Sequence, residues 1–364
     1  MMIMQRRIIK DIEESSEIKE FRLEALEKLE ETEVPKWKRI KYEVSPKENY
    51  KEFNNIQIEG EISHVVKKSD LPELNQGEDS YLEHFNKAYF NSGIVVEDGD
   101  RDIHIRYEMD DENNFLQDLN YIMVPEESKV NLIFEYSGEP KYGFRNTVTK
   151  VVVGRDAEVN IINLQRLGDR VESFSSIEVE AADRAKVNQY HLELGGGVNG
   201  GSSKVYLKGE NIQSENYSIY IADGDKKTDL EYSTYHFGRR GESLIEGRGI
   251  VKDRATKVFR GNLHFKKGSA RSVGKEEETA VLMNKGVKAD SIPTLFCKED
   301  DVVGEHAASA GQLNENKLFY LMSRGLTERE AKKMVAVSAF KPILEKLENR
   351  SIEEKVLEDI ERRI

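Results

Sequence analysis

The stretch Gly154-Arg-Asp-Ala-Glu-Val-Asn-Ile-Ile-Asn-Leu164 joins a tight turn to a run in which apolar and polar residues largely alternate. The same alternation marks Val130-Asn-Leu-Ile-Phe-Glu-Tyr136 and Lys204-Val-Tyr-Leu-Lys208. A period of two is typical of β-strands, because successive side chains point to opposite faces. No convincing amphipathic helix interrupts residues 121–303, so the sequence predicts a mainly β region without crossover helices.

Four turns in this region share a pattern in which a turn residue and an alanine precede a valine. The alanines are Ala157, Ala185, Ala255 and Ala270, and their separations of 28, 70 and 15 residues exclude a strict tandem repeat. Small residues at the turns, each followed by a short apolar strand, suit the stacked coils of a β-helix, whose turns must be thin. A β-sandwich is the alternative, because alternation alone does not separate the two folds.

Helical patterns flank the β region. Phe21, Ala25 and Leu29 recur at helical spacing within residues 1–34, and a second helix is expected at about residues 114–120. Residues 45–100 carry no clear pattern. The sequence therefore predicts an N-terminal helical or mixed region (1–120), a β-helix core (121–303) and a C-terminal helical domain (304–364).

The C-terminal domain carries the clearest helix signals. Asn314 can cap a helix that Gly325 ends, and Thr327-Glu-Arg-Glu330 forms a capping box for the next one. We expect this second helix to break near Pro342, because proline removes a backbone donor. The charged residues 351–364 predict one more, exposed helix.

Charge and composition exclude several classes of protein. The 68 acidic residues outnumber the 55 basic ones, and the net charge of −13 disfavours nucleic-acid binding. No run approaches the ~18 apolar residues of a membrane helix, and the first residues lack the apolar core of a signal peptide. The single cysteine, Cys297, forms no intrachain disulfide and fits a reducing compartment. We therefore expect a cytoplasmic protein that binds neither nucleic acid nor membrane.

A dense motif lies at the end of the strand region: Ile292-Pro-Thr-Leu-Phe-Cys-Lys-Glu-Asp-Asp-Val-Val-Gly-Glu-His306. It continues as Ala307-Ala-Ser-Ala-Gly-Gln-Leu-Asn314 and then Leu318-Phe-Tyr-Leu-Met-Ser-Arg-Gly325. These blocks, in this order, resemble the SufB/SufD family of iron–sulfur cluster assembly scaffolds. The segment Val258-Phe-Arg-Gly-Asn-Leu263 also resembles the family core. The likeness covers about residues 130–345 and is strongest after residue 220.

The resemblance implies a right-handed parallel β-helix flanked by helical regions. It implies that a Suf-type ABC ATPase binds the C-terminal helices, with Phe319, Tyr320, Met322 and Arg324 at the contact. Two β-helix subunits, identical or different, would dimerise and hold a nascent iron–sulfur cluster near their junction. The subunit itself would not be an enzyme, and the absence of a Walker motif from the sequence agrees with this.

Two positions depart from the family pattern. Ala307 stands where many members have glycine, and Glu278 falls near the position at which the bacterial B subunit carries its key cysteine. The chain thus resembles SufD-like proteins, and among them the minimal archaeal or anaerobe type that can act as a homodimer. The choice between homodimer and heterodimer, the cluster type and the sulfur donor stay open.

The candidate cluster ligands follow from coordination chemistry together with the resemblance. Iron–sulfur clusters prefer thiolates, so one Cys297 cannot hold a four-iron cluster. A two-fold dimer would bring two copies of Cys297 together, with Glu305 or His306 completing the ligand shell. Glu278 is a further candidate, although Glu276-Glu-Glu278 is more simply interpreted as an exposed acidic turn. Mixed ligation would be loose, which suits a scaffold that gives its cluster away.

Three alternatives remain at this stage. Cys297 can be a small packed residue without a ligand role. The protein can be a structural partner that binds the ATPase but no cluster. A β-helix enzyme acting on carbohydrate is disfavoured by the missing signal sequence and by the C-terminal helices. His236 and His264 are expected to be structural residues of the β-helix.

Overall fold

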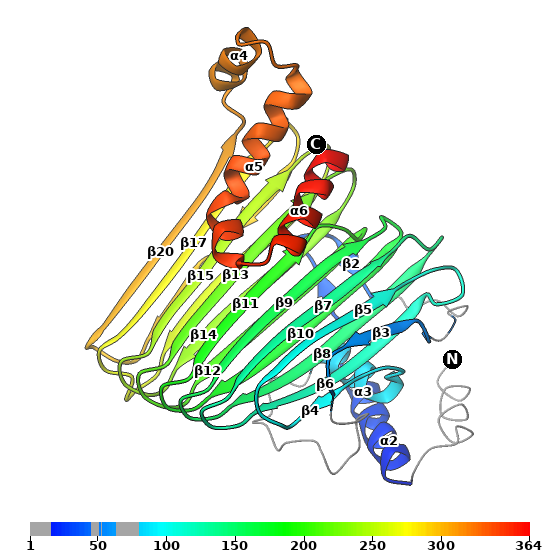
Figure 1. Cartoon of the computed structure of the whole chain (residues 1–364), viewed down its shortest axis with the longest axis vertical. Coiled ribbons are helices and arrows are strands. Elements are labelled where there is room, and N and C mark those ends of the chain that lie inside the picture. Colours follow the sequence, from blue (N-terminus) through cyan, green and yellow to red (C-terminus); the bar gives the residue numbers. More distant parts are fainter. Residues whose placement is uncertain (1–15, 45–50, 52, 63–79) are drawn as a thin grey trace.

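The computed structural model describes residues 16–44, 51, 53–62 and 80–364. Its main body is formed by two nine-stranded sheets, and successive long strands alternate between them (Figure 1). The first sheet contains β4 (Val95–Val96), β6 (Phe115–Val124), β8 (Gly143–Val153), β10 (Val171–Ala181), β12 (Val198–Leu207), β14 (Lys227–His236), β16 (Thr256–Phe265), β18 (Lys288–Ser291) and β19 (Thr294–Cys297). The second sheet contains β3 (Ile56–Glu59), β5 (Arg101–Glu108), β7 (Lys129–Gly138), β9 (Glu158–Leu167), β11 (Lys186–Glu193), β13 (Gln213–Ala222), β15 (Glu242–Val251), β17 (Ser272–Leu282) and β20 (Val302–Gln312).

The pairing identifies the fold as a parallel β-helix. Each strand from β5 to β16 pairs in parallel with the strand two positions along the chain, as β7 does with β9 and β9 with β11, and β17 pairs in parallel with β20. Only β3 joins the second sheet antiparallel, to β5. A sandwich of antiparallel hairpins is thereby excluded, and the predicted β-helix core with flanking helices is confirmed.

The interior is built from side chains stacked in register from coil to coil. Val130, Val159 and Val187 are paired neighbours on β7, β9 and β11, and all three are fully buried. The turns before β9 and β11 place Asp156 and Arg184 at φ of 59° and 56°, and the alanine after each is buried. The small residue at these turns therefore lets one coil stack directly on the next.

The N-terminal helices lie beside the first sheet. Helix α2 (Ser16–Glu31) packs on α3 (Tyr81–Tyr89), and both lie at the β4 end of the coil (Figure 1). Glu83 of α3 contacts Lys150 at 3.0 Å, and Lys150 also pairs with Glu178. The lysine charges hold the pKa of Glu83 at about 2, against the opposing effect of burial. This buried ion cluster fixes α3 to the sheet.

One expectation for the N-terminal half needs correction. The segment predicted to be a helix at 114–120 belongs to strand β6, which pairs in parallel with β8. Residue 121 accordingly lies inside a strand, and residue 303 lies inside β20. The proposed division at these residues stays a prediction. Residues 1–15 of the first predicted helix, and much of the 45–100 segment, lie outside the described residues.

The C-terminal helices cover the outer face of the second sheet. Helices α5 (Glu328–Leu347) and α6 (Arg350–Arg363) form an apolar cluster with β9, β11 and β13, while α4 (Glu315–Ser323) extends past the sheet (Figure 1). The Thr327–Glu330 capping box is present, but α5 runs through Pro342 without the expected break. Helix α6 is also not exposed along its length, since Ile352, Val356 and Ile360 are buried. Among the described helices, none is long and apolar enough to cross a membrane.

Candidate functional site

Among the residues that the structure describes, no further coil covers the last strands of the β-helix. Strands β18 and β19 both pair with β16, and β20 pairs with β17 along eleven residues. Almost every residue of β20 is exposed, in contrast to the buried strands before it. Figure 1 shows β20 as the outermost strand of the second sheet. This open end of the coil contains the motif that the sequence singled out.

Cys297 lies on the inward-facing row of this open end. It is the register neighbour of Phe265, which is fully buried in the interior. The preceding residue, Phe296, points to the opposite face, where its ring stacks on that of His264 at 4.5 Å. With no coil above it, Cys297 is an exposed free thiol. Within the single chain, Cys297 is therefore not packed in the core.

His306 faces inward from the other sheet. Its register neighbour is Glu276 of β17, a buried residue. Gly304, two residues earlier on the same strand, also faces inward, because a Cβ placed there would meet the interior side chains of Leu295 and Phe265. Cys297 and His306 thus come from the two facing sheets of the last coil, and both are exposed at its open end.

Glu305 faces the other way. Its register neighbour is Lys275, which is exposed on the outer face. Successive residues of a strand alternate between faces, so Glu305 and His306 of one chain do not converge on one site. Of the two predicted companions of Cys297, the fold places His306 on the same side as the thiol.

The acidic triplet on β17 is not the exposed turn that the sequence suggested. Glu276 and Glu278 point into the coil and are 2% and 1% exposed, while Glu277 lies on the outer face. Lys257 forms an ion pair with Glu278, and the Tyr220 hydroxyl donates a hydrogen bond of 2.5 Å to the same carboxylate. Burial lowers the pKa of Lys257, although Glu278 opposes that shift.

Glu276 differs from Glu278 because it lacks a compensating partner. Among the described residues, the Oε2 atoms of both carboxyl groups are buried without a hydrogen-bond donor, but the Oε1 atom of Glu278 contacts Lys257 and the Tyr220 hydroxyl. Burial, together with the nearby Glu278 charge, raises the pKa of Glu276 to about 8. Sequence reasoning missed this residue. The alternation Gly274, Glu276, Glu278, Ala280 was the available signal, because small and apolar positions at both ends of that row mark it as the inward one.

Two glycines lie against these acidic side chains, and Gly247 also makes room for the Phe259 ring. A Cβ at Gly261 would lie 2.3 Å from Cγ of Glu276, and one at Gly247 would lie 3.2 Å from Cγ of Glu278. The last full coil is therefore shaped around two inward-pointing acids directly beneath the open end. His236 and His264 lie in ring stacks, His236 against Phe265 and His264 between Tyr235 and Phe296, as expected of structural residues.

The inward-facing side chains at the open end supply one thiol, one imidazole and two carboxyl groups, but they do not surround a single metal position. Among the side chains that the structure describes, no group of three or more His, Cys, Asp or Glu residues is arranged to hold a metal ion. A thiolate with nitrogen and oxygen ligands is a donor set that iron accepts. In a single chain, this set is open on the side where β20 ends the sheet.

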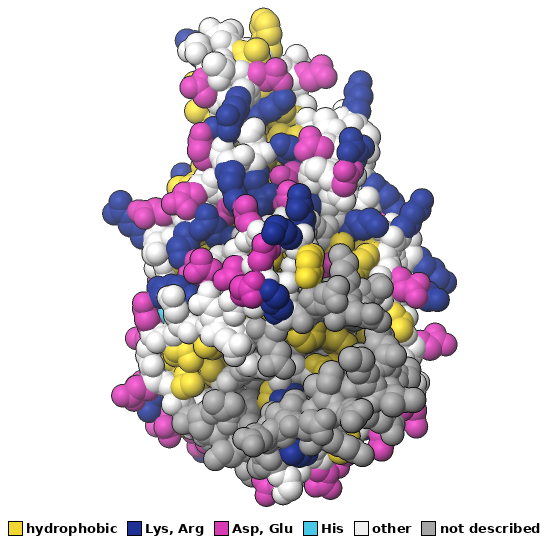
Figure 2. Space-filling view, turned by 90° about the vertical axis from the view of Figure 1, so that its right-hand side faces the viewer, with side chains coloured by type: hydrophobic (Ala, Val, Ile, Leu, Met, Phe, Trp, Pro, Cys, Tyr) yellow, Lys and Arg dark blue, Asp and Glu magenta, His cyan; other side chains and the backbone are white. Residues whose placement is uncertain are grey.

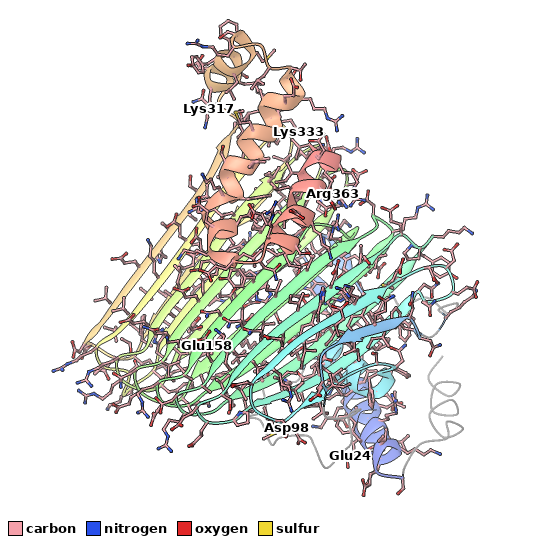
Figure 3. The ribbon with its side chains drawn as sticks, in the orientation of Figure 1. Glu24, Asp98, Glu158, Lys317, Lys333 and Arg363 are labelled. Carbon is pink, nitrogen blue, oxygen red and sulfur yellow. The ribbon has the colours of Figure 1, made fainter. Side chains whose placement is uncertain are left out.

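The predicted ATPase-binding residues lie together on α4. Phe319, Tyr320 and Met322 are 73%, 56% and 41% exposed, and the guanidinium of Arg324 lies 5.3 Å from the centre of the Tyr320 ring. Hydrophobic side chains appear at the top of the molecule, where α4 projects (Figure 2). Lys317 marks this helix in Figure 3, well away from the sheet that carries α6 and Arg363. Elsewhere on the face in Figure 2, basic and acidic side chains are interspersed.

The fold and the open end define a class: a β-helix protein with a thiol and an imidazole at an uncovered coil end and a helical extension beside it. The family model described as "SUF system FeS cluster assembly, SufBD core domain" matches residues 107–340. This match covers more than half of the chain. The protein therefore belongs to the SufBD family of iron–sulfur cluster assembly proteins.

Curated relatives agree with the family. The chain is 25% identical over 260 residues to the iron–sulfur cluster assembly protein SufD of Bacillus subtilis, covering 70% of this chain and 59% of that protein. It is 23% identical over 321 residues to SufB of the same organism, covering 81% of this chain and 68% of SufB. A SufBD family protein of Mycobacterium tuberculosis is 28% identical over 202 residues, which is 56% of this chain and 24% of that protein. The chain thus spans less than two thirds of the SufD and mycobacterial relatives.

Proposed function

We propose that this protein is a cytoplasmic scaffold that holds a nascent iron–sulfur cluster, as cargo, at the open end of its β-helix. One observation carries the proposal: the only cysteine of the chain is exposed on the inward row of the last coil, and His306 faces inward from the opposite sheet. A thiol that served packing would lie beneath another coil rather than above the last one. The protein acts in this role as a scaffold, not as a catalyst.

The ligand set is completed by a second chain. In the part of the chain that the structure describes, no strand pairs with the outer edge of the eleven-residue strand β20, and such edges are normally covered or paired. A second β-helix joined there would bring a second thiol to the site if it were a copy of this chain. Cys297 and His306 are the primary ligands in this arrangement. Glu278 lies too deep and is already paired with Lys257, so we assign it a structural role.

Glu305 serves the same site only across the junction. Its side chain belongs to the outer row of its own strand. It could therefore contact a cluster only across the junction with the partner chain. We therefore rank it below His306 as a ligand.

The ATPase partner would bind α4. Three large apolar side chains on a nine-residue helix that buries none of its residues form a surface that a partner protein can cover. Phe319, Tyr320 and Met322 supply the apolar contact area, and Arg324 adds a charge at its rim. We infer that a Suf-type ABC ATPase binds α4. Conformational changes during the ATPase cycle would then reach the second sheet through α5.

Anaerobic reconstitution with ferrous iron and sulfide tests the cluster role. We expect the parent protein to bind iron and acid-labile sulfide with an absorption and Mössbauer spectrum of a cluster, and Cys297→Ser to fall nearly to background. Ser309→Ala, an exposed change on the same strand β20, is the matched control and should load normally. If the folded Cys297→Ser protein loads like the parent, the chain is instead a structural partner that binds the ATPase without a cluster.

A further inference from the structure

Glu276 is a buried carboxyl group whose position lowers stability. No contact among the described residues of one chain compensates for that loss. It is 2% exposed, and its Oε2 atom has no hydrogen-bond donor among the described residues. The buried cation nearest in the row, Lys257, is committed to Glu278, to the Ser291 hydroxyl and to a backbone carbonyl. Burying a polar group without a partner is unfavourable, and such exceptions in folded proteins call for an explanation.

The interior is nevertheless built to keep this side chain in place. Gly261 on the facing sheet leaves the space that Glu276 fills, since a Cβ there would lie 2.3 Å from Cγ and 2.8 Å from Oε1 of Glu276. Any larger residue at position 261 would displace the carboxyl group. The cavity therefore fits Glu276 specifically, and the missing element is a donor.

The register supplies one candidate donor. His306 is the paired neighbour of Glu276 on the next strand, and both face inward. Neighbouring strands lie ~4.8 Å apart, so a rotation of the imidazole brings a ring nitrogen within hydrogen-bonding distance of the carboxylate. The ring is exposed, so this rotation meets no packed neighbour on the open side.

We propose that Glu276 is the positioning residue for His306: its carboxyl group accepts the N–H of one ring nitrogen through an oxygen atom and turns the other nitrogen, with its lone pair, toward the open end. This inference rests on the proposed function for the role of the second nitrogen as an iron ligand. A histidine that binds metal commonly donates its other N–H to a carboxylate, which fixes the tautomer and the ring orientation. Glu276 therefore acts through His306 and does not itself touch the cluster.

The tautomer of His306 in the metal-free protein is the direct readout. The full-length chain would be labelled with ¹⁵N-histidine, and the His306 signals would be assigned among the seven histidines by their loss in His306→Ala. We expect the parent to show the two well-separated ring-nitrogen signals of one neutral tautomer. In Glu276→Leu both signals should move toward the averaged positions of exchanging tautomers.

Glu277→Leu is the matched control, because it removes the same group from the outer face of the same strand, where Glu277 pairs with Arg248 at 3.1 Å. It should leave the His306 signals unchanged. Ferrous iron binding, measured on the same proteins, should weaken ~10–100-fold in Glu276→Leu and little in the control. Glu276→Met, which keeps a similar volume without a carboxyl or amide oxygen, is the second variant should leucine disturb folding, and it should move the signals in the same direction.

Unchanged His306 signals in both folded Glu276 variants would overturn the pairing. The outcome is independent of cluster loading, because the signals are read without iron. If the Glu276 variants move the signals while His306→Ala loads a cluster like the parent, the pairing stands and the ligand role of His306 in the proposed function fails.

Discussion

Lys257 and Glu278 form an ion pair in which neither side chain is exposed at all, one coil below the open end of the β-helix. Tyr220 donates to the same carboxylate, so the pair is part of a small polar cluster beside the apolar residues of the interior. Removing one member of a buried pair leaves an uncompensated charge, whereas removing both does not.

The first prediction concerns this pair. Lys257→Met should lower the free energy of unfolding by about 3–5 kcal/mol, because it leaves the Glu278 carboxylate buried alone. The double variant Lys257→Met with Glu278→Leu should recover most of that loss. Urea unfolding of both proteins measures the difference. If the double variant is no more stable than Lys257→Met alone, an unpaired Glu278 charge is not the cause of the lost stability.

The second prediction is a pH dependence caused by Glu276. Its pKa is about 8 in the folded protein against 4.5 ordinarily, so between these values the folded state binds a proton that the unfolded state has released. The contribution of this group to stability is therefore fully present below about pH 4.5 and is lost as the pH rises to about 8. The slope can reach about 1.4 kcal/mol per pH unit.

Glu276→Gln removes this titration while keeping the volume. The difference in unfolding free energy between variant and parent should therefore grow in favour of the variant as the pH rises from 5 to 8. Taking the difference cancels the shared effect of Glu193, whose pKa burial raises to about 7. A difference that stays constant over this range would show that Glu276 is ionised in the folded protein at neutral pH.

The third prediction separates ATPase binding from folding. Deleting residues 312–364 would be a poor test, because α5 and α6 cover apolar residues of the second sheet such as Tyr217 and Ile219. Phe319→Asp changes only the exposed surface of α4, where the side chain is 73% exposed. We expect this variant to lose co-purification with the cognate ATPase at unchanged thermal stability. Lys341→Asp, exposed on α5, is the control that should keep binding.

How much of the fold can be predicted from the sequence depends on which side chains fill the interior of the β-helix. Where the inward row is apolar, as at Val130, Val159 and Val187, alternation predicts the strand and its facing correctly. Strand β6 was mistaken for a helix because Gln117, Asp118 and Asn120 are buried on it, so no polar face stands out. Their side chains are hydrogen-bonded to residues of β8, which lie almost thirty residues away in the sequence.

The candidate site shows the same limit. Cys297, Glu305 and His306 were singled out from a motif and its resemblance, but only the strand register separates the inward His306 from the outward Glu305. Glu276 escaped notice because three adjacent acids normally mark a solvated surface. The glycine that makes room for it, Gly261, precedes it by fifteen residues and lies on the other sheet.

The last prediction concerns assembly through β20. Ala307 and Ala308 are adjacent, both exposed, and face opposite sides of the strand, Ala308 being the register neighbour of the buried Glu278. If a second chain covers the open end, a lysine on the inward row becomes a charge buried in the junction, which is strongly unfavourable. Ala308→Lys should therefore shift the protein to monomer in light scattering at micromolar concentration, while Ala307→Lys should have the smaller effect. The prediction of a junction at this end is contradicted if the parent protein is itself monomeric and binds no second β-helix subunit. The unpaired edge of β20 would then be stable in water on its own.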